Sequence, residues 1–191
     1  MRKSIVFVLL FSFLFIASSV NREYTKEIKF QDETFVRASL ESNNGQFLAE
    51  FIPEDTTFKN FEKMVAVYYY KGDLGSAKSQ AFAKHEEIKQ RNADGDPIAN
   101  GVVYVKEDDT QQAIYDFVLS DKEWTIAERN VMLFKNEPEG MLLVKYVERM
   151  YLEDKNNEDM KVFFEKILKN RQSIVDELTE TEWQIPDLGR K

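Results

Sequence analysis

Apolar residues near the C-terminal end of the chain recur at intervals of three and four, the spacing of one face of an α-helix. The stripe consists of Met160, Phe163, Phe164, Ile167, Leu168, Arg171, Ile174, Val175 and Leu178. Asn156 or Asn157 supplies a cap, and Glu158 and Asp159 suit the positive end of the helix dipole. We therefore predict a long terminal helix that packs its apolar face on a hydrophobic surface.

A second, shorter helical stripe follows a glycine-containing turn at residues 71–75. Ser76 is placed to cap a helix that runs to about Arg91. One face of this helix carries four residues at helical spacing: Ala77, Ala81, His85 and Ile88. Residues 92–100, which include Gly95 and Pro97, are predicted to form a loop.

Runs of β-branched and aromatic residues, partly alternating with polar ones, predict strands elsewhere. These strands are residues 34–40, 46–52, 64–70, 101–106, 111–119, 124–134 and 141–151. Asn44-Gly45 and residues 136–140 mark hairpin turns. We expect the polar residues 21–30 to be loosely held, and Thr56 or Thr57 to cap a short helical turn that reaches Glu62.

The order of these elements indicates the fold class. Strands follow one another in meander-like runs, without a regular strand-helix-strand alternation, so we predict an α+β fold with a mainly antiparallel sheet. The two longer helices are expected to pack on one face of that sheet. We predict a single domain over residues 20–191, large enough to fold without the disulfides that the cysteine-free sequence excludes.

The first residues have the features of a cleavable secretory signal peptide. Arg2 and Lys3 precede a run of apolar residues at positions 5–16, and Ala17-Ser18-Ser19 offers small residues for cleavage after Ser19. The alternative is a membrane anchor, but the run is shorter than the roughly 20 apolar residues that span a bilayer. We therefore expect residues 1–19 to be removed and the protein to be periplasmic or secreted.

The excess of acidic residues limits the kinds of molecule that the protein is expected to bind. The chain has 26 Lys and Arg against 34 Asp and Glu, and loss of the leader removes two basic residues. An acidic chain repels phosphate backbones and anionic headgroups, so nucleic acid and membrane surfaces are poor expectations. We expect another protein as the partner; the sequence leaves its identity and the oligomeric state open.

The segment FIPEDTTFKNFEKMV, at residues 51–65, resembles exported bacterial PsbP-like and DcrB-like proteins. In those proteins a strand leads through a proline and a short aromatic helix into a second strand. The order that follows here is also similar, and the resemblance covers roughly residues 46–181. Some relatives carry Trp in the short helix where this chain has Phe61. The resemblance implies an α/β/α-like sandwich used for binding or assembly, and it transfers no catalytic residue.

Metal and histidine chemistry find little support in the sequence. Asn92, Asp94 and Asp96 have the alternating oxygen ligands that begin a calcium loop, but Pro97 and Val103 occupy positions that need Gly and Glu. A polar turn is the simpler interpretation. His85 is the only histidine, and the chain contains no Gly-x-Ser-x-Gly elbow that would suggest a triad around it. We expect no metal and no cofactor.

Acidic pairs are the remaining route to acid-base catalysis. They are Asp108 with Asp109, Glu137 with Glu139, and Glu153 with Asp154. All lie in turn-like stretches, where carboxylates are ordinarily solvated, whereas a hydrolase needs its two acids at a set separation in a cleft.

Tyrosines on predicted strands are the candidate binding residues: Tyr68, Tyr69, Tyr70, Tyr104 and Tyr115. Most should pack beneath helices, but rings facing away from the helices would form a binding surface. Period-two alternation puts Tyr68 and Tyr70 on one face and Tyr69 on the other.

Three functional hypotheses remain. The first is an exported non-catalytic binding or assembly module for another protein, such as an immunity or inhibitor protein whose acidity suits a basic toxin. The second is a small exported hydrolase that uses a carboxylate pair. The third is a carrier of an apolar ligand beneath the terminal helix.

Overall fold

A computed structural model describes residues 24–105, 111–152 and 157–185, which form one eight-stranded sheet and two long helices. The strands are β1 (Glu27–Phe30), β2 (Glu33–Asn43), β3 (Gln46–Pro53), β4 (Lys63–Lys71), β5 (Asn100–Tyr104), β6 (Gln112–Ser120), β7 (Ile126–Glu137) and β8 (Gly140–Tyr151). The helices are α1 (Ala77–Ala93) and α2 (Asn157–Glu180). The α+β class with an antiparallel sheet and two longer helices is confirmed. The expected leader, residues 1–19, lies outside the described residues.

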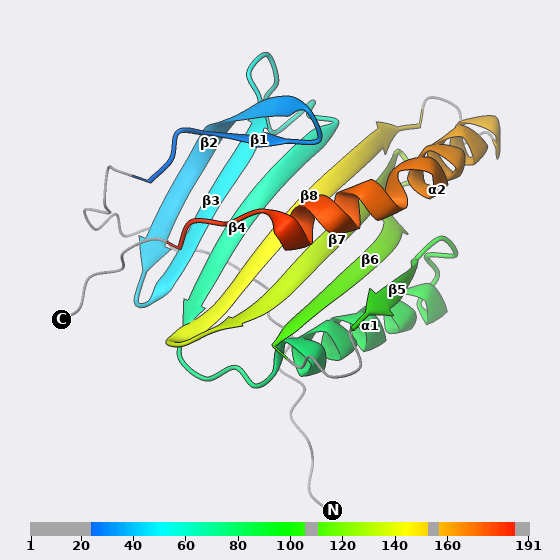
Figure 1. Ribbon diagram of the computed structural model, residues 1–191. Coiled ribbons are helices and arrows are strands. Elements are labelled where there is room, and N and C mark those ends of the chain that lie inside the picture. The colour runs from blue at the N-terminus through cyan, green and yellow to red at the C-terminus, as the bar shows by residue number, and fades with distance from the viewer. Residues whose placement is uncertain (1–23, 106–110, 153–156, 186–191) are drawn as a thin grey trace, which may run out of the picture.

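The sheet is built from two meanders that meet at its centre (Figure 1). Its spatial order is β1-β2-β3-β4-β8-β7-β6-β5, and every neighbouring pair is antiparallel. The chain leaves β4 at the centre, passes through α1 to the far edge at β5, and returns strand by strand to β8. No helix in the described part of the chain is long and apolar enough to cross a membrane.

Helix α1 begins as its sequence predicts. The Ser76 hydroxyl accepts a hydrogen bond from the Ser79 backbone N–H at 3.1 Å, which satisfies one of the free donors of the first turn. Ala77 and Ala81 are fully buried, because small side chains let the helix approach β6 closely.

The two helices lie on opposite faces of the sheet, so the prediction of one shared face is wrong. Tyr115 and Phe117 of β6 belong to the core under α1, whereas Ile114 and Val118, which point the other way, belong to the cores under α2. The physical reason lies in β6, β7 and β8, which are apolar on both faces and therefore need cover on both.

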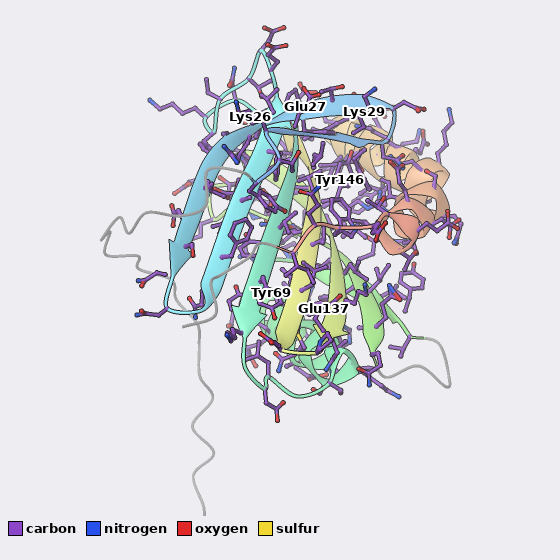
Figure 2. The ribbon with its side chains drawn as sticks, turned by 60° about the vertical axis from the view of Figure 1, so that its left-hand side comes forward. Lys26, Glu27, Lys29, Tyr69, Glu137 and Tyr146 are labelled. Atoms are coloured by element: carbon purple, nitrogen blue, oxygen red, sulfur yellow. The ribbon has the colours of Figure 1, made fainter. Side chains whose placement is uncertain are left out.

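The N-terminal segment is more ordered than its polar sequence suggests. Residues 27–30 form β1, which pairs with β2 through a tight turn in which Gln31 and Asp32 have φ values of 51° and 59°. Lys29 is exposed along β1 (Figure 2), whereas Phe30 is fully buried, with its ring 5.0 Å from that of Tyr146. The expectation of a loosely held start is therefore wrong for β1, because one buried aromatic residue and tertiary contacts outweigh local polarity.

The expected turn before β4 forms and Thr57 caps it, but it does not extend as a helix to Glu62. The Thr57 hydroxyl accepts from the Lys59 N–H at 3.3 Å, the Asn60 N–H donates to the Thr57 carbonyl at 3.1 Å, and Asn60 Oδ1 accepts from the Thr57 N–H at 2.8 Å. The turn places Phe61 over the sheet, where it packs with Ile52 and Met64.

The two glycine hairpins are confirmed. Asn44 and Gly45 have φ values of 47° and 81°, as a two-residue hairpin turn between β2 and β3 requires. Gly140 begins β8 against the end of β4, where an added Cβ would lie 2.1 Å from the Tyr70 carbonyl oxygen. A side chain at position 140 would therefore push apart the two strands that join the meanders.

Candidate functional site

The sheet face that carries α1 is covered only in part. Helix α1 packs against β5, β6 and β7, and Phe61 covers one end of the same face near Met64 and Val147. On this face α1 does not extend over β3 and β4, and α2 lies on the opposite face of the sheet (Figure 1). We call this region the open face and define it by five partly exposed residues, Leu48, Glu50, Tyr68, Tyr70 and Lys145, which lie around the buried Leu143.

Strand register places these side chains together. Leu48 pairs with Tyr68, and Tyr68 pairs with Leu143, so one row crosses three strands. The next row runs from Glu50 through Ala66 to Lys145 and continues to Met132 on β7. Directly paired residues point to the same face, so the open face is a contiguous surface.

Tyr68 and Tyr70 form the aromatic part of the open face. Their rings stack at 6.4 Å between centroids and 3° between planes, and both side chains are partly exposed. Burial raises the pKa of Tyr70 to about 12 and, together with the charges of Glu50 and Glu128, raises that of Tyr68 further. Both phenols therefore remain neutral donors at physiological pH, and neither hydroxyl meets a hydrogen-bond partner among the described residues.

Lys145 lies at the centre of the open face. It is partly buried, and its cross-strand neighbours Ala66 and Met132 are apolar. Burial lowers the pKa of the Lys145 amine below its ordinary value, while the charges of Glu128 and Glu50 oppose that shift. Within the described ranges, its Nζ atom forms no hydrogen bond and no ion pair. The amine is therefore a partly buried donor without an acceptor.

The acids beside Lys145 are already occupied. Glu128 Oε2 accepts from Arg149 Nη2 at 2.8 Å and Nε at 3.1 Å, and its Oε1 accepts from Asn130 Nδ2 at 3.0 Å. The Arg149 guanidinium also lies 4.0 Å from the centre of the Phe61 ring. On β3, Glu50 Oε2 accepts from the Ser39 hydroxyl at 2.7 Å. Both oxygens of Glu128 and one oxygen of Glu50 therefore accept hydrogen bonds, whereas the Lys145 amine has no described acceptor.

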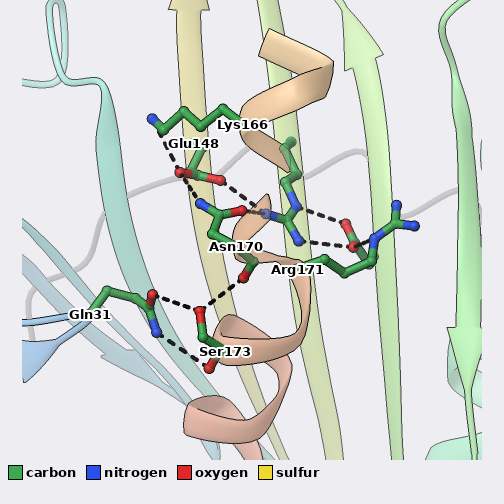
Figure 3. Close-up of polar contacts among 8 residues, drawn as sticks. Gln31, Glu148, Lys166, Asn170, Arg171 and Ser173 are labelled. Atoms are coloured by element: carbon green, nitrogen blue, oxygen red, sulfur yellow. Dashed lines mark hydrogen bonds and ion pairs between the residues drawn. The ribbon is translucent and has the colours of Figure 1, made fainter. Parts of the chain in front are cut away.

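The opposite face of the sheet holds a second group of charges, which we call the buried charge cluster (Figure 3). Its members are Asp116, Arg129, Glu148, Lys166, Asn170 and Arg171. Arg129 and Asp116 are fully buried, and Glu148 is 2% exposed. The cluster joins β6, β7 and β8 to α2.

Every charge of the buried charge cluster has a partner. Arg129 donates to both Asp116 oxygens at 3.0 Å, to Glu148 Oε2 at 3.1 Å and to Asn170 Oδ1 at 2.8 Å. Arg171 Nε donates to Asp116 Oδ2 at 2.9 Å, and Lys166 pairs with Glu148 at 3.3 Å. Burial alone would lower the pKa of Arg129, but Asp116 and Glu148 raise it above its ordinary value. A cluster in which every charge has a partner is expected to hold α2 on the sheet, and it leaves no free group for catalysis.

The structure separates the five predicted tyrosines. Tyr68 and Tyr70 lie together on the open face, whereas Tyr69 is 6% exposed in the core under α2. Tyr104 packs partly buried against that same core. Tyr115 is fully buried beneath α1, where its hydroxyl lies 3.3 Å from His85 Nδ1.

His85 and the calcium-like loop both have structural roles. His85 packs edge-on against the Tyr115 ring at 5.5 Å. The Asp96 carboxylate accepts hydrogen bonds from Arg91 Nε at 2.8 Å and from the Ser120 N–H and hydroxyl, both at 2.9 Å. Burial alone would raise the pKa of Asp96, but these hydrogen bonds hold it below its ordinary value. No group of metal ligands occurs among the described residues.

Of the predicted acidic pairs, only one falls in the described residues. Glu137 pairs with Lys135 at 3.0 Å, and Glu139 pairs with Lys71 at 3.7 Å, so each acid has its own cation. Asp108 with Asp109 and Glu153 with Asp154 lie outside the described ranges.

Sequence reasoning did not identify Lys145 or the buried charge cluster. A signal was present, because Asp116, Arg129, Lys145 and Glu148 each interrupt an apolar strand. A charge in the middle of such a strand requires a partner or a function.

Comparison with known proteins gives one match and one negative result. A search of curated proteins finds no match to the chain. A protein-family model matches residues 23–183, a span that contains all eight strands and both helices. The chain therefore belongs to the family that this model describes.

Proposed function

We propose that this protein is an exported, non-catalytic binding module that engages another protein through the open face. One observation carries the proposal: Tyr68, Tyr70 and Lys145 present donors without described acceptors on the α1 face of the sheet, beside the part that α1 covers. Tyrosines with an apolar body and a polar tip are typical of protein interfaces.

The export part of this proposal rests on the leader-like residues 1–19, and the family match begins after them, at residue 23. Helices on both faces of an antiparallel sheet also agree with the sandwich that the PsbP-like resemblance implies, and we propose that relationship as well. N-terminal sequencing of the protein from its native cells tests export. We expect a new N-terminus close to residue 20, and recovery of intact Met1 from the cytosol would overturn it.

Binding is favoured over hydrolysis by the state of the acids. Asp116 and Glu148 converge, but both are held by Arg129 away from solvent. Glu50 and Glu128 lie near Lys145, but each already accepts hydrogen bonds. Neither pair supports the alternative of a small hydrolase with a carboxylate pair, which needs one free acid and one free base.

The carrier hypothesis also lacks support. The region beneath α2 is occupied by the buried charge cluster and by Ile167, Ile174 and Leu178, which are at most 2% exposed. An immunity or inhibitor protein remains a specific form of the proposed function, because the acidic surface would attract a basic toxin.

Site-specific photo-crosslinking in native cells tests the proposed surface. A photoreactive residue replacing Leu48 or Tyr70 should crosslink to one defined protein, because both positions lie on the open face. The matched control is Phe82, a 45% exposed apolar residue on α1. A defined adduct at Phe82 but none at Leu48 or Tyr70 would reject the open face as the binding surface.

A further inference from the structure

We propose that Lys145 anchors a carboxylate on the partner, supplied by an Asp or Glu side chain that projects next to an apolar residue. This inference rests on the proposed function and specifies the chemistry of its central contact. Lys145 is the cation of the open face, and its Nζ atom forms no ion pair with the described residues.

Three donors of this face have no acceptor among the described residues. They are the Lys145 amine and the hydroxyls of Tyr68 and Tyr70, whereas Glu50 and Glu128 already accept from Ser39, Asn130 and Arg149. A ligand that completes this face must therefore bring acceptors. A carboxylate brings two acceptor oxygens and the negative charge that an isolated ammonium requires.

The local charge favours a single carboxylate over a phosphate. Arg149 is held between Glu128 and the Phe61 ring, so it is not available as a second cation. Glu50 and Glu128 also repel additional negative charge. Phosphate carries more charge than one lysine can neutralise, whereas one carboxylate matches it.

The surroundings of Lys145 indicate why the acid should stand beside an apolar residue. Ala66, Met132 and Leu143 are at most 9% exposed, and they surround Lys145 on its own and the adjacent strands. An apolar residue next to the partner's acid can pack on them and exclude water from the ion pair. Exclusion of water strengthens the attraction between the two charges.

Proton uptake is a distinctive consequence. A bound carboxylate stabilises the ammonium form and so raises the pKa of Lys145, which burial lowers in the free protein. The titratable groups that face this amine are Glu50, Glu128, Arg149 and Tyr68. Binding should therefore take up protons wherever free Lys145 is partly neutral.

Benzoate is a suitable probe, because it combines one carboxylate with an apolar ring. Titration followed by NMR should shift the signals of Lys145, Met132 and Leu143, and calorimetry in two buffers should report proton uptake. Benzamide, the uncharged isostere, should bind about tenfold more weakly or not at all. Equal binding of benzoate and benzamide would overturn the proposal.

Two matched variants locate the effect. Lys145→Met keeps the length and apolar stem of the side chain but removes the charge, and it should weaken benzoate binding about tenfold. Lys78→Met removes one lysine charge from an exposed site on α1 and should leave binding unchanged. An equal loss in both variants would indicate only a general charge effect and would overturn the assignment to Lys145.

Partner capture separates the two proposals. The comparison uses protein with the photoreactive residue at Leu48 or Tyr70, with Lys145 either intact or replaced by Met. If the protein with intact Lys145 crosslinks to a partner and Lys145→Met reduces that yield about tenfold, both proposals stand. If crosslinking persists undiminished in Lys145→Met, the carboxylate anchor is wrong and the binding surface stands. If the wild-type protein yields no adduct at Leu48 or Tyr70, the proposed function fails whatever benzoate does.

Discussion

The two faces of the sheet differ in whether their charged side chains have partners. On the α2 face, Arg129, Asp116 and Glu148 are buried and fully paired, and they fasten a helix to three strands. On the open face, Lys145 is only partly buried and has no described counter-ion. Paired charge under a helix stabilises the fold, whereas a donor left unpaired at a surface costs stability and is available for binding.

The largest effect should follow from breaking the buried charge cluster. Arg129→Met leaves Asp116 and Glu148 buried without their central cation, and we expect a loss of about 3–5 kcal/mol in the free energy of unfolding. Urea denaturation measures it. Lys166→Met is the control, because Lys166 is 53% exposed and contributes little. A loss below 1 kcal/mol for Arg129→Met would contradict the fastening role.

A smaller loss should follow from removing the Asp96 carboxylate. Asp96→Asn weakens the hydrogen bonds that hold Ser120 and Arg91, at an expected cost of about 1–3 kcal/mol near neutral pH. Because the fold lowers the pKa of Asp96, its stabilisation is present above the ordinary aspartate pKa and is lost as pH falls through the folded value. Urea titrations at several pH values should show the difference from wild type shrinking in acid. A difference independent of pH would contradict this assignment.

Removing the charge at the centre of the open face should raise the free energy of unfolding instead of lowering it. Lys145→Met removes an unpaired, partly buried ammonium, and we expect a gain of about 1 kcal/mol in the free energy of unfolding at neutral pH. The fold lowers the pKa of Lys145, so the cost is present below the folded pKa and disappears as pH rises towards the ordinary lysine value. The gain over wild type should therefore shrink in alkali. A destabilised Lys145→Met would mean that the amine has a stabilising partner.

The smallest change should come from Tyr68→Phe. Its hydroxyl has no hydrogen-bond partner in the described ranges, so unfolding should change by less than about 0.5 kcal/mol. Partner crosslinking at Leu48 should nevertheless weaken, because the hydroxyl is a donor on the binding surface. The comparison variant is Tyr24→Phe, which loses a hydrogen bond to the Gln184 carbonyl and should cost about 1 kcal/mol. A similar loss in both would contradict an unpaired Tyr68.

Prediction from the sequence succeeded where the signal was local. The Ser76 cap, the Asn44-Gly45 hairpin and helix α2 were recognised because each depends on residues close together in the chain. The predicted stripe of α2 was too wide, because Phe164 and Leu168 are 37% and 69% exposed. Prediction failed for β1, whose formation depends on Phe30 meeting Tyr146 more than a hundred positions away in the sequence. It identified Thr57 as a cap but made the turn too long, because the turn ends before Glu62.

The candidate site shows the same division. Period-two alternation was sufficient to put Tyr68 and Tyr70 on one face, opposite Tyr69, as the cores show. It did not reveal which face would stay uncovered, or that Lys145 would lie beside the two tyrosines. Those facts depend on β8 pairing with β4 and on α1 lying over β5, β6 and β7.

The sequence by itself determined the element types, the antiparallel pairing of neighbouring strands and the absence of disulfides, because these follow from local periodicity, turn chemistry and composition. Only the tertiary structure decided which charges would be paired. Asp116, Arg129, Glu148 and Lys145 each interrupt an apolar strand in the same way. Helix α2 covers Asp116, Arg129 and Glu148 and supplies polar partners for them, whereas neither helix covers Lys145. Long-range packing therefore decides which charges stabilise the fold and which lie on the candidate binding surface.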